Sequence, residues 1–219
     1  NPVGKTKVTG GGRTEGKQAL TLDEQKLFLQ ESRCYVYYNG LAFVLQTGLR
    51  VGELTALKWS DIDFENRKMS VERSATWIKG QGLVFGNTKT ESGRREIPLT
   101  KEAIEILKRQ KEKNSQNKIV PIQYKDFVFI NSKGSPIPRC AYNKGIWATC
   151  DRVGMRRFSI HLLRHTFATR CIENGMRPKT LQAILGHSRI EMTMNLYVHV
   201  TEDSKAEEME MIECNLKLV

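Results

Sequence analysis

The sequence predicts an α+β fold, a mainly helical domain with a small antiparallel β-sheet on one side. Apolar residues recur at helical spacing before residue 60 and after residue 100, whereas strand-like alternation is confined to residues 66–99. Glycines stand where several of the helical segments would end. With 219 residues, the chain is one large domain or two small ones, and it is long enough to bury a sizeable core.

The chain begins with a segment that lacks the composition of a folded element. Residues 1–18 are rich in Gly, Lys and Thr and nearly free of large apolar side chains, so we interpret them as a linker. A first helix is predicted to follow, because Thr21 and Glu24 have the spacing of a capping box. Leu27 and Phe28 are expected to lie on its apolar face.

Two further helices are predicted before residue 60. The second is expected to end at Gly48, because glycine commonly terminates helices. The third covers residues 52–59, and its apolar positions Leu54 and Leu57 are expected to be buried.

The small sheet is predicted to follow these helices. Residues 66–78 and 82–99 show strand-like alternation, with Gly-containing turns at Gly80–Gly82 and Glu91–Gly93. The next helix is predicted at Thr100–Lys113, where the apolar positions are Ala103, Ile104 and Leu107.

The C-terminal part of the chain is predicted to be mostly helical. Phe127–Ile130 reads as a short strand and Lys133–Pro138 as a turn. Four helical segments then follow, at residues 140–153, 159–174, 178–186 and 189–199.

The last segment, residues 201–219, is expected to be a separate helical tail. Its apolar residues repeat at spacings of three, four and three, which places them on one helix face. This face either packs on its own domain or docks onto a neighbouring subunit, and the sequence leaves both options open. The apolar positions are Met209, Ile212, Leu216 and Val219.

The net charge favours a polyanionic partner. Lys and Arg number 35 against 24 Asp and Glu, giving +11 and a pI near 9.5. Residues 202–219 hold six acids and two bases, a net of −4, so the first 201 residues carry +15. Such an excess suits nucleic acid, whose phosphates release counterions on binding. A basic surface with no such role fits the charge alone equally well.

The cysteines and the hydropathy exclude several classes of protein. Five cysteines without a CxxC pair indicate neither a disulfide framework nor a zinc finger, and reduced thiols in the cytoplasm are the simplest account. No apolar stretch approaches the roughly 20 residues that span a membrane, so no membrane partner is expected.

The segment HLLRH combines histidines and an arginine at helical spacing. His161 and Arg164 are three residues apart and share a face of a predicted helix. His161 and His165 have the spacing of zinc-binding HExxH helices, but Leu162 stands where the required Glu would be. We therefore predict no metal site and a structural role for His165.

Five short motifs together resemble the tyrosine recombinases of the phage integrase family. They are TGLRVGELTALKW, TKTESGRREIPL, HLLRHTFAT, LGHS and MNLYVHV, in this order. The resemblance covers about residues 19–200 and implies the catalytic domain of such an enzyme. The hairpin motif is most similar to integrases of conjugative transposons.

The resemblance implies a metal-independent site that holds a DNA phosphate. Arg50 and Arg164 would grip the phosphate, which suits the fixed charge and planar donor fork of arginine. Tyr197 would be the nucleophile, with the arginines favouring its phenolate form and His161 accepting its proton. Taken singly, this histidine and this tyrosine fit ordinary helix positions just as well.

Three further residues have supporting roles in the implied site. Lys89 would protonate the leaving 5′-oxygen from the tip of the hairpin, although other basic residues lie nearby. His187 would bond the phosphate or the leaving oxygen, or else simply cap the helix before it. Glu53 would support the arginines, or else stabilise a helix N-terminus.

The resemblance also implies the partners of the domain. They are double-stranded DNA core sites, three more copies of the chain in a tetramer on paired sites, and a directionality factor. No cofactor, ATP or metal is implied, because the phosphotyrosine bond preserves the phosphoester energy. The reaction would integrate and excise a mobile element in the bacterial cytoplasm, and residues 1–18 would join the domain to missing N-terminal DNA-binding domains.

Two other functions remain open at the level of sequence. A type IB topoisomerase shares the tyrosine chemistry but relaxes DNA without exchange, and the hairpin and LGHS motifs favour the recombinase. A basic DNA-binding regulator would carry these residues incidentally, and the lack of a covalent DNA adduct would distinguish it from both enzymes.

Overall fold

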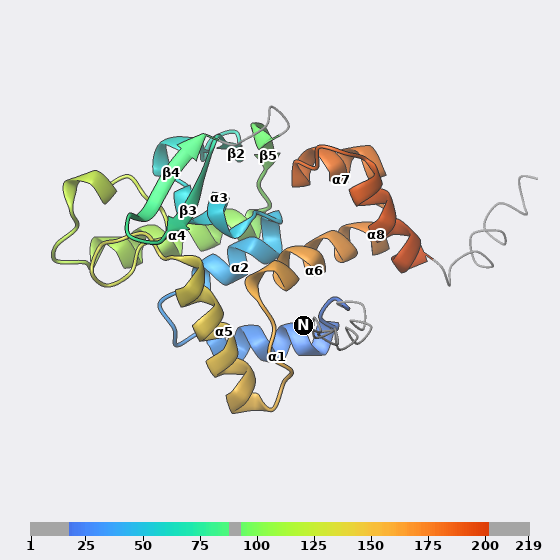
Figure 1. Cartoon of the computed structure of the whole chain (residues 1–219), viewed down its shortest axis with the longest axis horizontal. Helices are drawn as coiled ribbons and strands as arrows, with labels where there is room; N and C mark the ends of the chain where they lie inside the picture. The colour runs from blue at the N-terminus through green and yellow to red at the C-terminus, as the bar shows by residue number, and fades with distance from the viewer. Residues whose placement is uncertain (1–17, 88–92, 202–219) are drawn as a thin grey trace, which may run out of the picture.

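The computed structural model describes residues 18–87 and 93–201, and it confirms a mainly helical fold with small antiparallel sheets on one side. In Figure 1 the strands lie above the central helices α2 and α6, while α1 and α5 lie below them. The described helices are α1 (Leu22–Ser32), α2 (Tyr38–Thr47), α3 (Val51–Ala56), α4 (Lys101–Ser115), α5 (Arg139–Val153), α6 (Ile160–Glu173), α7 (Pro178–Leu185) and α8 (Glu191–Thr201).

The first helix begins where its capping box predicts. The Glu24 amide donates to the Thr21 hydroxyl (3.1 Å), and the Thr21 amide donates to the Glu24 carboxylate (2.8 Å). Phe28 is fully buried, but Leu27 is 41% exposed. The prediction that both face the core was wrong for Leu27, because adjacent helical positions diverge by about 100°.

Helix α3 is shorter than predicted because its end is set by a distant segment. The backbone leaves the helix at Leu57, whose carbonyl accepts from the Val128 amide (2.9 Å), and Lys58 forms an isolated bridge with Phe127. Residues 127–130 are buried but form only isolated bridges, so the predicted short strand was also wrong. Leu54 and Leu57 are buried as expected.

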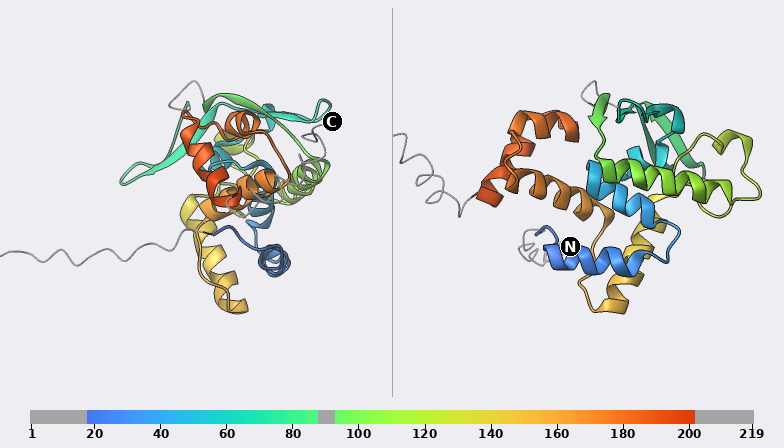
Figure 2. Two further views of the ribbon diagram at one scale, coloured as in Figure 1. Left: turned by 90° about the vertical axis from the view of Figure 1, so that its right-hand side faces the viewer. Right: turned by 180° about the vertical axis from the view of Figure 1, so that it is seen from behind.

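The β region divides into two sheets, whereas the sequence predicted one small sheet from residues 66–78 and 82–99. β1 (Ile62–Asp63), β2 (Lys68–Val71) and β5 (Arg95–Pro98) form one antiparallel sheet, in which Val71 lies opposite Arg95. β3 (Arg73–Ile78) and β4 (Gly82–Asn87) form a separate ribbon that extends away from the helices (Figure 2, left). Two short 3-10 helices, Trp59–Asp61 and Ile122–Tyr124, complete the described elements.

One close approach fixes α3 against the ribbon. A side chain at Gly52 would place its Cβ 2.4 Å from the Ser74 hydroxyl oxygen and 2.7 Å from the Ala75 carbonyl oxygen. Only glycine permits this contact between α3 and β3. The position of α3 matters because Arg50 stands immediately before it and Glu53 lies within its first turn.

Two apolar clusters hold the helices together. The larger joins α1, α2, α4, α5 and the start of α6 to the three-stranded sheet, and fully buried aromatic residues such as Phe43 and Tyr142 lie within it. The smaller attaches α7 and α8 to the second half of α6. Its buried members are Ala168, Ile172, Leu181 and Leu185.

The four C-terminal helices are present close to the predicted ranges, and α2 ends at Gly48 with the left-handed backbone expected there (φ 64°). The predicted linker up to residue 17, Lys89 and the tail beyond residue 201 lie outside the described residues. Within the described ranges, none of the helices has the length and apolar character needed to cross a membrane.

Candidate active site

Three arginines from separate parts of the chain meet at the carboxyl end of α7. The last carbonyls of a helix lack partners within it and carry the negative end of its dipole, so cations are stabilised there. Three consecutive carbonyls at this end each accept a hydrogen bond from a different guanidinium. Ile184 accepts from Arg95 (2.6 Å), Leu185 from Arg164 (2.8 Å) and Gly186 from Arg50 (2.8 Å).

Glu53 lies at the centre of this arginine cluster and is almost completely buried. One carboxylate oxygen accepts from the guanidiniums of Arg50 (2.9 Å) and Arg95 (3.0 Å). The other accepts from the Arg50 amide (2.9 Å) and from Arg95 (2.8 Å). Burial alone raises the pKa of Glu53, but the bonds and charges of Arg95 and then Arg50 outweigh it and lower the pKa below its usual value. Glu53 is therefore an ionised bridge between two arginines.

Arg164 is more enclosed than Arg50, whose side chain is 37% exposed. It is only 9% exposed, and it donates a further hydrogen bond to the Gly48 carbonyl (2.6 Å). Burial, together with repulsion from Arg50 and Arg95, lowers its pKa to about 9, so the guanidinium remains charged at neutral pH. Three cations surround one carboxylate, so the cluster has an excess of positive charge that attracts an anion.

The cluster retains hydrogen-bond donors for such an anion. A guanidinium has five N–H groups. Within the described residues, the Arg50 side chain uses two of these groups, one on Glu53 and one on Gly186. The Arg164 side chain also uses two, one on Gly48 and one on Leu185. Each therefore has three N–H groups left, and donors of this kind match the oxygens of a phosphate.

His187 follows the arginine cluster directly and is held in place. Its side chain is buried, and its Nδ1 lies 2.9 Å from the Thr193 hydroxyl, which is itself fully buried. Burial, then repulsion from Arg164, Arg50 and Arg95, lowers the pKa of His187 to about 4. The imidazole is thus neutral at pH 7, and when Thr193 donates to Nδ1 the other nitrogen, Nε2, carries the hydrogen.

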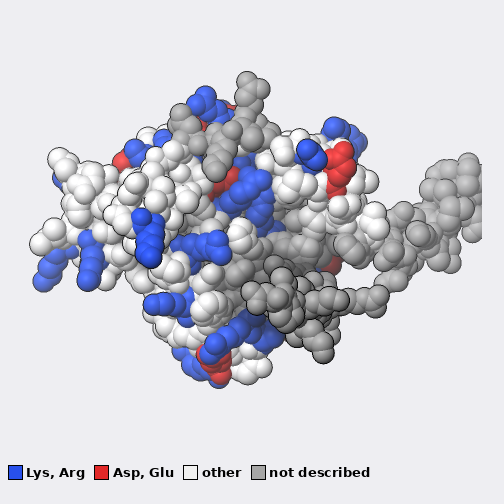
Figure 3. Space-filling view, viewed as in Figure 1, with Lys and Arg blue, Asp and Glu red and all other residues white. Residues whose placement is uncertain are grey.

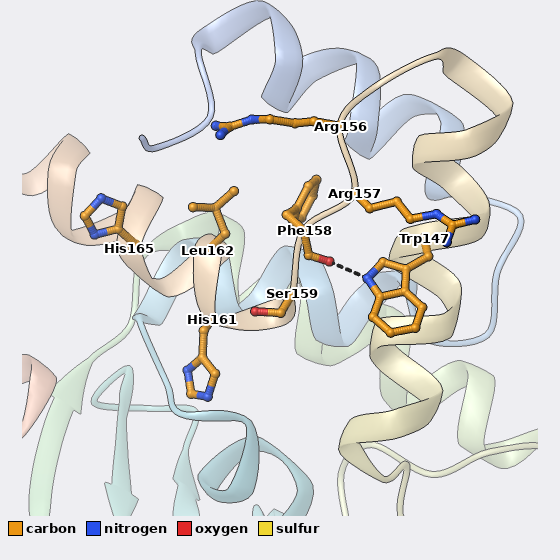
Figure 4. Close-up of a pocket in the computed structure, with 8 residues that line it drawn as sticks. All are labelled: Trp147, Arg156, Arg157, Phe158, Ser159, His161, Leu162 and His165. Carbon is orange, nitrogen blue, oxygen red and sulfur yellow. Dashed lines mark hydrogen bonds between the residues drawn. The ribbon is translucent and has the colours of Figure 1, made fainter. Parts of the chain in front are cut away.

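His161 is exposed at the first turn of α6, one turn before Arg164. Figure 4 shows it with His165 on the wall of a cavity of about 550 Å³, where the Trp147 indole donates to the Phe158 carbonyl (2.9 Å). Among residues 18–87 and 93–201, no group of three or more His, Cys, Asp and Glu side chains is placed to hold a metal ion.

Tyr197 lies on α8 and packs against the smaller apolar cluster. Burial raises the pKa of its hydroxyl, and the Cys171 thiol raises it further. The sequence led us to expect the opposite shift, from nearby arginines. That expectation does not hold in this conformation, because the surroundings of the ring are apolar.

Lys89 lies outside the described residues, but the strand that follows its segment does not. Strand β5 lies beside α7 in Figure 1 and carries Arg95 into the cluster. Figure 3 shows the molecule from the same side as Figure 1, and on this face Lys and Arg side chains predominate over Asp and Glu side chains.

Sequence reasoning missed two residues of this site. Arg95 alternates with Ile97 and Leu99, both buried, so its place on the inward face of a strand was a readable signal. A charged residue on such a face requires a partner. Thr193 gave no comparable signal, because its contact with His187 depends on how α8 folds back.

This fold is shared with the catalytic domains of tyrosine recombinases. The model of the phage integrase family matches residues 18–204, and the chain belongs to this family. Within the family, it is related to the integrases of conjugative transposons.

Two curated relatives illustrate this relationship. The transposase from transposon Tn916 of Enterococcus faecalis is 36% identical over 210 residues, covering 91% of this chain and 52% of the relative. A XerC-like tyrosine recombinase of Caldanaerobacter subterraneus subsp. tengcongensis is 33% identical over 180 residues, covering 76% of this chain and 46% of the relative. The chain thus spans about half the length of the curated relatives it matches.

Solved structures agree with the fold. The Tn1549 transposon integrase in complex with transposon right end DNA has a TM-score of 0.81 and 33% identity, over 91% of this chain and 67% of that one. The XerA recombinase, at 24% identity, supports the fold alone, with a TM-score of 0.66 over 92% of this chain and 66% of that one.

Proposed function

We propose that residues 19–200 form the catalytic domain of a site-specific DNA recombinase. The reaction cleaves and rejoins DNA strands through a covalent 3′-phosphotyrosine intermediate. The observation that carries this proposal is the convergence of Arg50, Arg95 and Arg164 on one helix end, with Glu53 as their shared carboxylate. Such an excess of fixed positive charge and free donors suits a phosphodiester, whose negative charge spreads over its oxygens in the transition state.

Arg50 and Arg164 bind the two non-bridging oxygens of the scissile phosphate. Their carbonyl contacts fix both guanidiniums before DNA arrives, so little reorganisation accompanies the reaction. Removing one preorganised donor of this kind typically costs about 3–4 kcal/mol in the barrier. Neutral His187 adds a hydrogen bond through Nε2 to the phosphate or to the leaving oxygen.

Tyr197 is the nucleophile. Its oxygen forms a bond to phosphorus as the bond from phosphorus to the deoxyribose 5′-oxygen breaks. The phenolic proton passes to His161, and Lys89 gives a proton to the leaving 5′-oxygen. In the conformation described, the Tyr197 ring packs against the smaller apolar cluster and the pKa of its hydroxyl is raised, so attack depends on transfer of the phenolic proton.

The partners we propose follow from the family. The domain acts on double-stranded core sites as a tetramer, exchanges strands through a four-way junction, and responds to a directionality factor. The tail, residues 201–219, docks either on its own domain or on a neighbouring subunit. No cofactor, ATP or metal is needed, and the biological outcome is integration and excision of a mobile element in the cytoplasm, on bacterial DNA.

Covalent trapping tests the proposal directly. The protein is incubated at micromolar concentration with a nicked duplex carrying the ends of its element, and the products are separated on a denaturing gel. We expect a protein–DNA adduct that Tyr197→Phe abolishes. The absence of any adduct, or an adduct that survives this substitution, would refute the assignment of Tyr197 as the nucleophile. Transfer between two labelled duplexes distinguishes a recombinase from a topoisomerase, which only relaxes supercoils.

A further inference from the structure

Arg95 differs from the two phosphate-binding arginines in how its donors are used. It lies on β5 with its side chain only 6% exposed. Of its five N–H groups, four are engaged: two on Glu53, one on the Ile184 carbonyl and one on the Gly93 carbonyl (3.1 Å). A guanidinium so nearly saturated has little left for a phosphate, so its role lies in what it holds.

Arg95 joins three segments of the site that have no covalent connection nearby. Through Glu53 it reaches Arg50 at the start of α3, and through Ile184 it reaches the helix end that leads to His187. Its own strand continues from the hairpin segment. A shift of Arg95 therefore moves the groups on which Arg50 and His187 rely.

Arg95 also determines how far Glu53 neutralises the charge of Arg50. Glu53 accepts hydrogen bonds from both guanidiniums, so its negative charge is shared between them. Without Arg95, this carboxylate would neutralise Arg50 alone, and the cluster would lose half of its excess positive charge. The fork geometry matters as well, because a lysine ammonium is a point charge on a flexible stem and lacks the rigid fork that donates to both carboxylate oxygens and to the Ile184 carbonyl.

We propose that Arg95 is a positioning residue that holds Glu53, Arg50 and the carboxyl end of α7 in register for phosphate binding. The inference rests on the proposed recombinase function, and it assigns a role to a residue of the TKTESGRREIPL motif for which the resemblance implied none. Arg95 acts through Glu53 and the α7 carbonyls rather than by contact with DNA.

The principal test replaces Arg95 with lysine, which retains the charge and removes the fork. We expect Arg95→Lys to form the phosphotyrosine adduct about 100-fold more slowly at saturating nicked duplex, the scale of loss seen when reacting groups are misplaced by about 1 Å. The dissociation constant for the duplex should change less than about threefold, because the charge that attracts DNA remains. An adduct rate within about threefold of the unmodified chain would overturn the proposal.

Two controls separate positioning from general effects. Arg94→Lys makes the same substitution at the exposed neighbouring position and should leave the adduct rate unchanged. Ile106→Val, in the core on α4, provides a destabilised variant remote from the site. The two variants are compared where Ile106→Val and Arg95→Lys lower the melting temperature equally. If Ile106→Val then slows adduct formation as much as Arg95→Lys does, the effect is one of stability and the proposal fails.

A further variant and a second readout keep the test decisive. If Arg95→Lys does not fold, the double variant Glu53→Gln/Arg95→Gln removes both buried charges and should fold. We expect this double variant to form the adduct slowly, and a rate near that of the unmodified chain overturns the proposal.

NMR titration of His187 needs no activity. Arg95→Gln should raise its pKa by removing a nearby cation, and an unchanged pKa refutes the coupling. If the unmodified chain forms no adduct, the proposed function fails, and the titration still tests the coupling between Arg95 and His187.

Discussion

The neutral state of His187 leads to a prediction about stability and pH. The unfolded chain should bind a proton at this histidine near pH 6.5, whereas in the folded state burial and the three arginines lower its pKa to about 4. Between these values the unfolded state binds more protons, so stability falls as the pH falls. The contribution of His187 is therefore fully present above pH 6.5 and is lost progressively down to about pH 4.

The size of the loss follows from the two pKa values. At about 1.4 kcal/mol per pKa unit, the full depression corresponds to about 3 kcal/mol, and about 2.5 kcal/mol of this is lost by pH 4.5. Such a loss is a large part of the total stability of an ordinary domain, about 5–15 kcal/mol.

Urea unfolding at pH 7.5 and pH 4.5 measures this loss. His187→Gln keeps a polar side chain that does not titrate, so comparing it with the unmodified chain cancels the carboxylates that both share. We expect the unmodified chain to lose about 2.5 kcal/mol more than the variant between the two pH values. Equal losses would refute the reasoning, and so would an NMR titration of His187 with a midpoint near 6.5.

Three further predictions concern the same site. Arg164→Met should slow adduct formation about 100- to 1000-fold at saturating nicked duplex, as measured on denaturing gels, because it removes a preorganised guanidinium; a loss below tenfold would contradict this role. Thr193→Val should leave the Nδ1 of His187 without its buried partner and lower the unfolding free energy by about 1–3 kcal/mol in urea, with no change expected if this contact is dispensable. Gly48→Ala should destabilise the fold by more than about 2 kcal/mol in the same assay, because the left-handed backbone is strained by a side chain and the new Cβ would lie 2.4 Å from the Phe167 ring; a neutral effect would show that α2 ends differently.

Local signals made parts of the fold predictable from sequence. The capping box at Thr21 and the stop at Gly48 depend on residues next to them, so both helix boundaries were found. The end of α3 at Leu57 depends on residues 127–128, about 70 positions away, and no local pattern reports such a pairing. The division of the β region between two sheets is a similar choice among partners.

The site was predictable in its residues but not in its construction. Motifs named Arg50, Arg164, His187 and Tyr197, yet the atoms that bring the arginines together are backbone carbonyls at the end of α7. Every residue has a backbone carbonyl, so residue identity does not indicate which carbonyls accept these hydrogen bonds. The arrangement is therefore seen only in the fold. The apolar surroundings of Tyr197 also depend on how α8 packs, which explains the wrong direction of the expected pKa shift.

The arginine contacts with α7 have a consequence for biosynthesis. The bond from Arg50 to Gly186 spans 136 positions, and that from Arg95 to Ile184 spans 89. A nascent chain on the ribosome therefore completes Arg50 and Glu53 long before the carbonyls that orient them exist. Such long-range closure is slow relative to local helix formation. The arginine cluster therefore forms only after α7 has left the ribosome and docked.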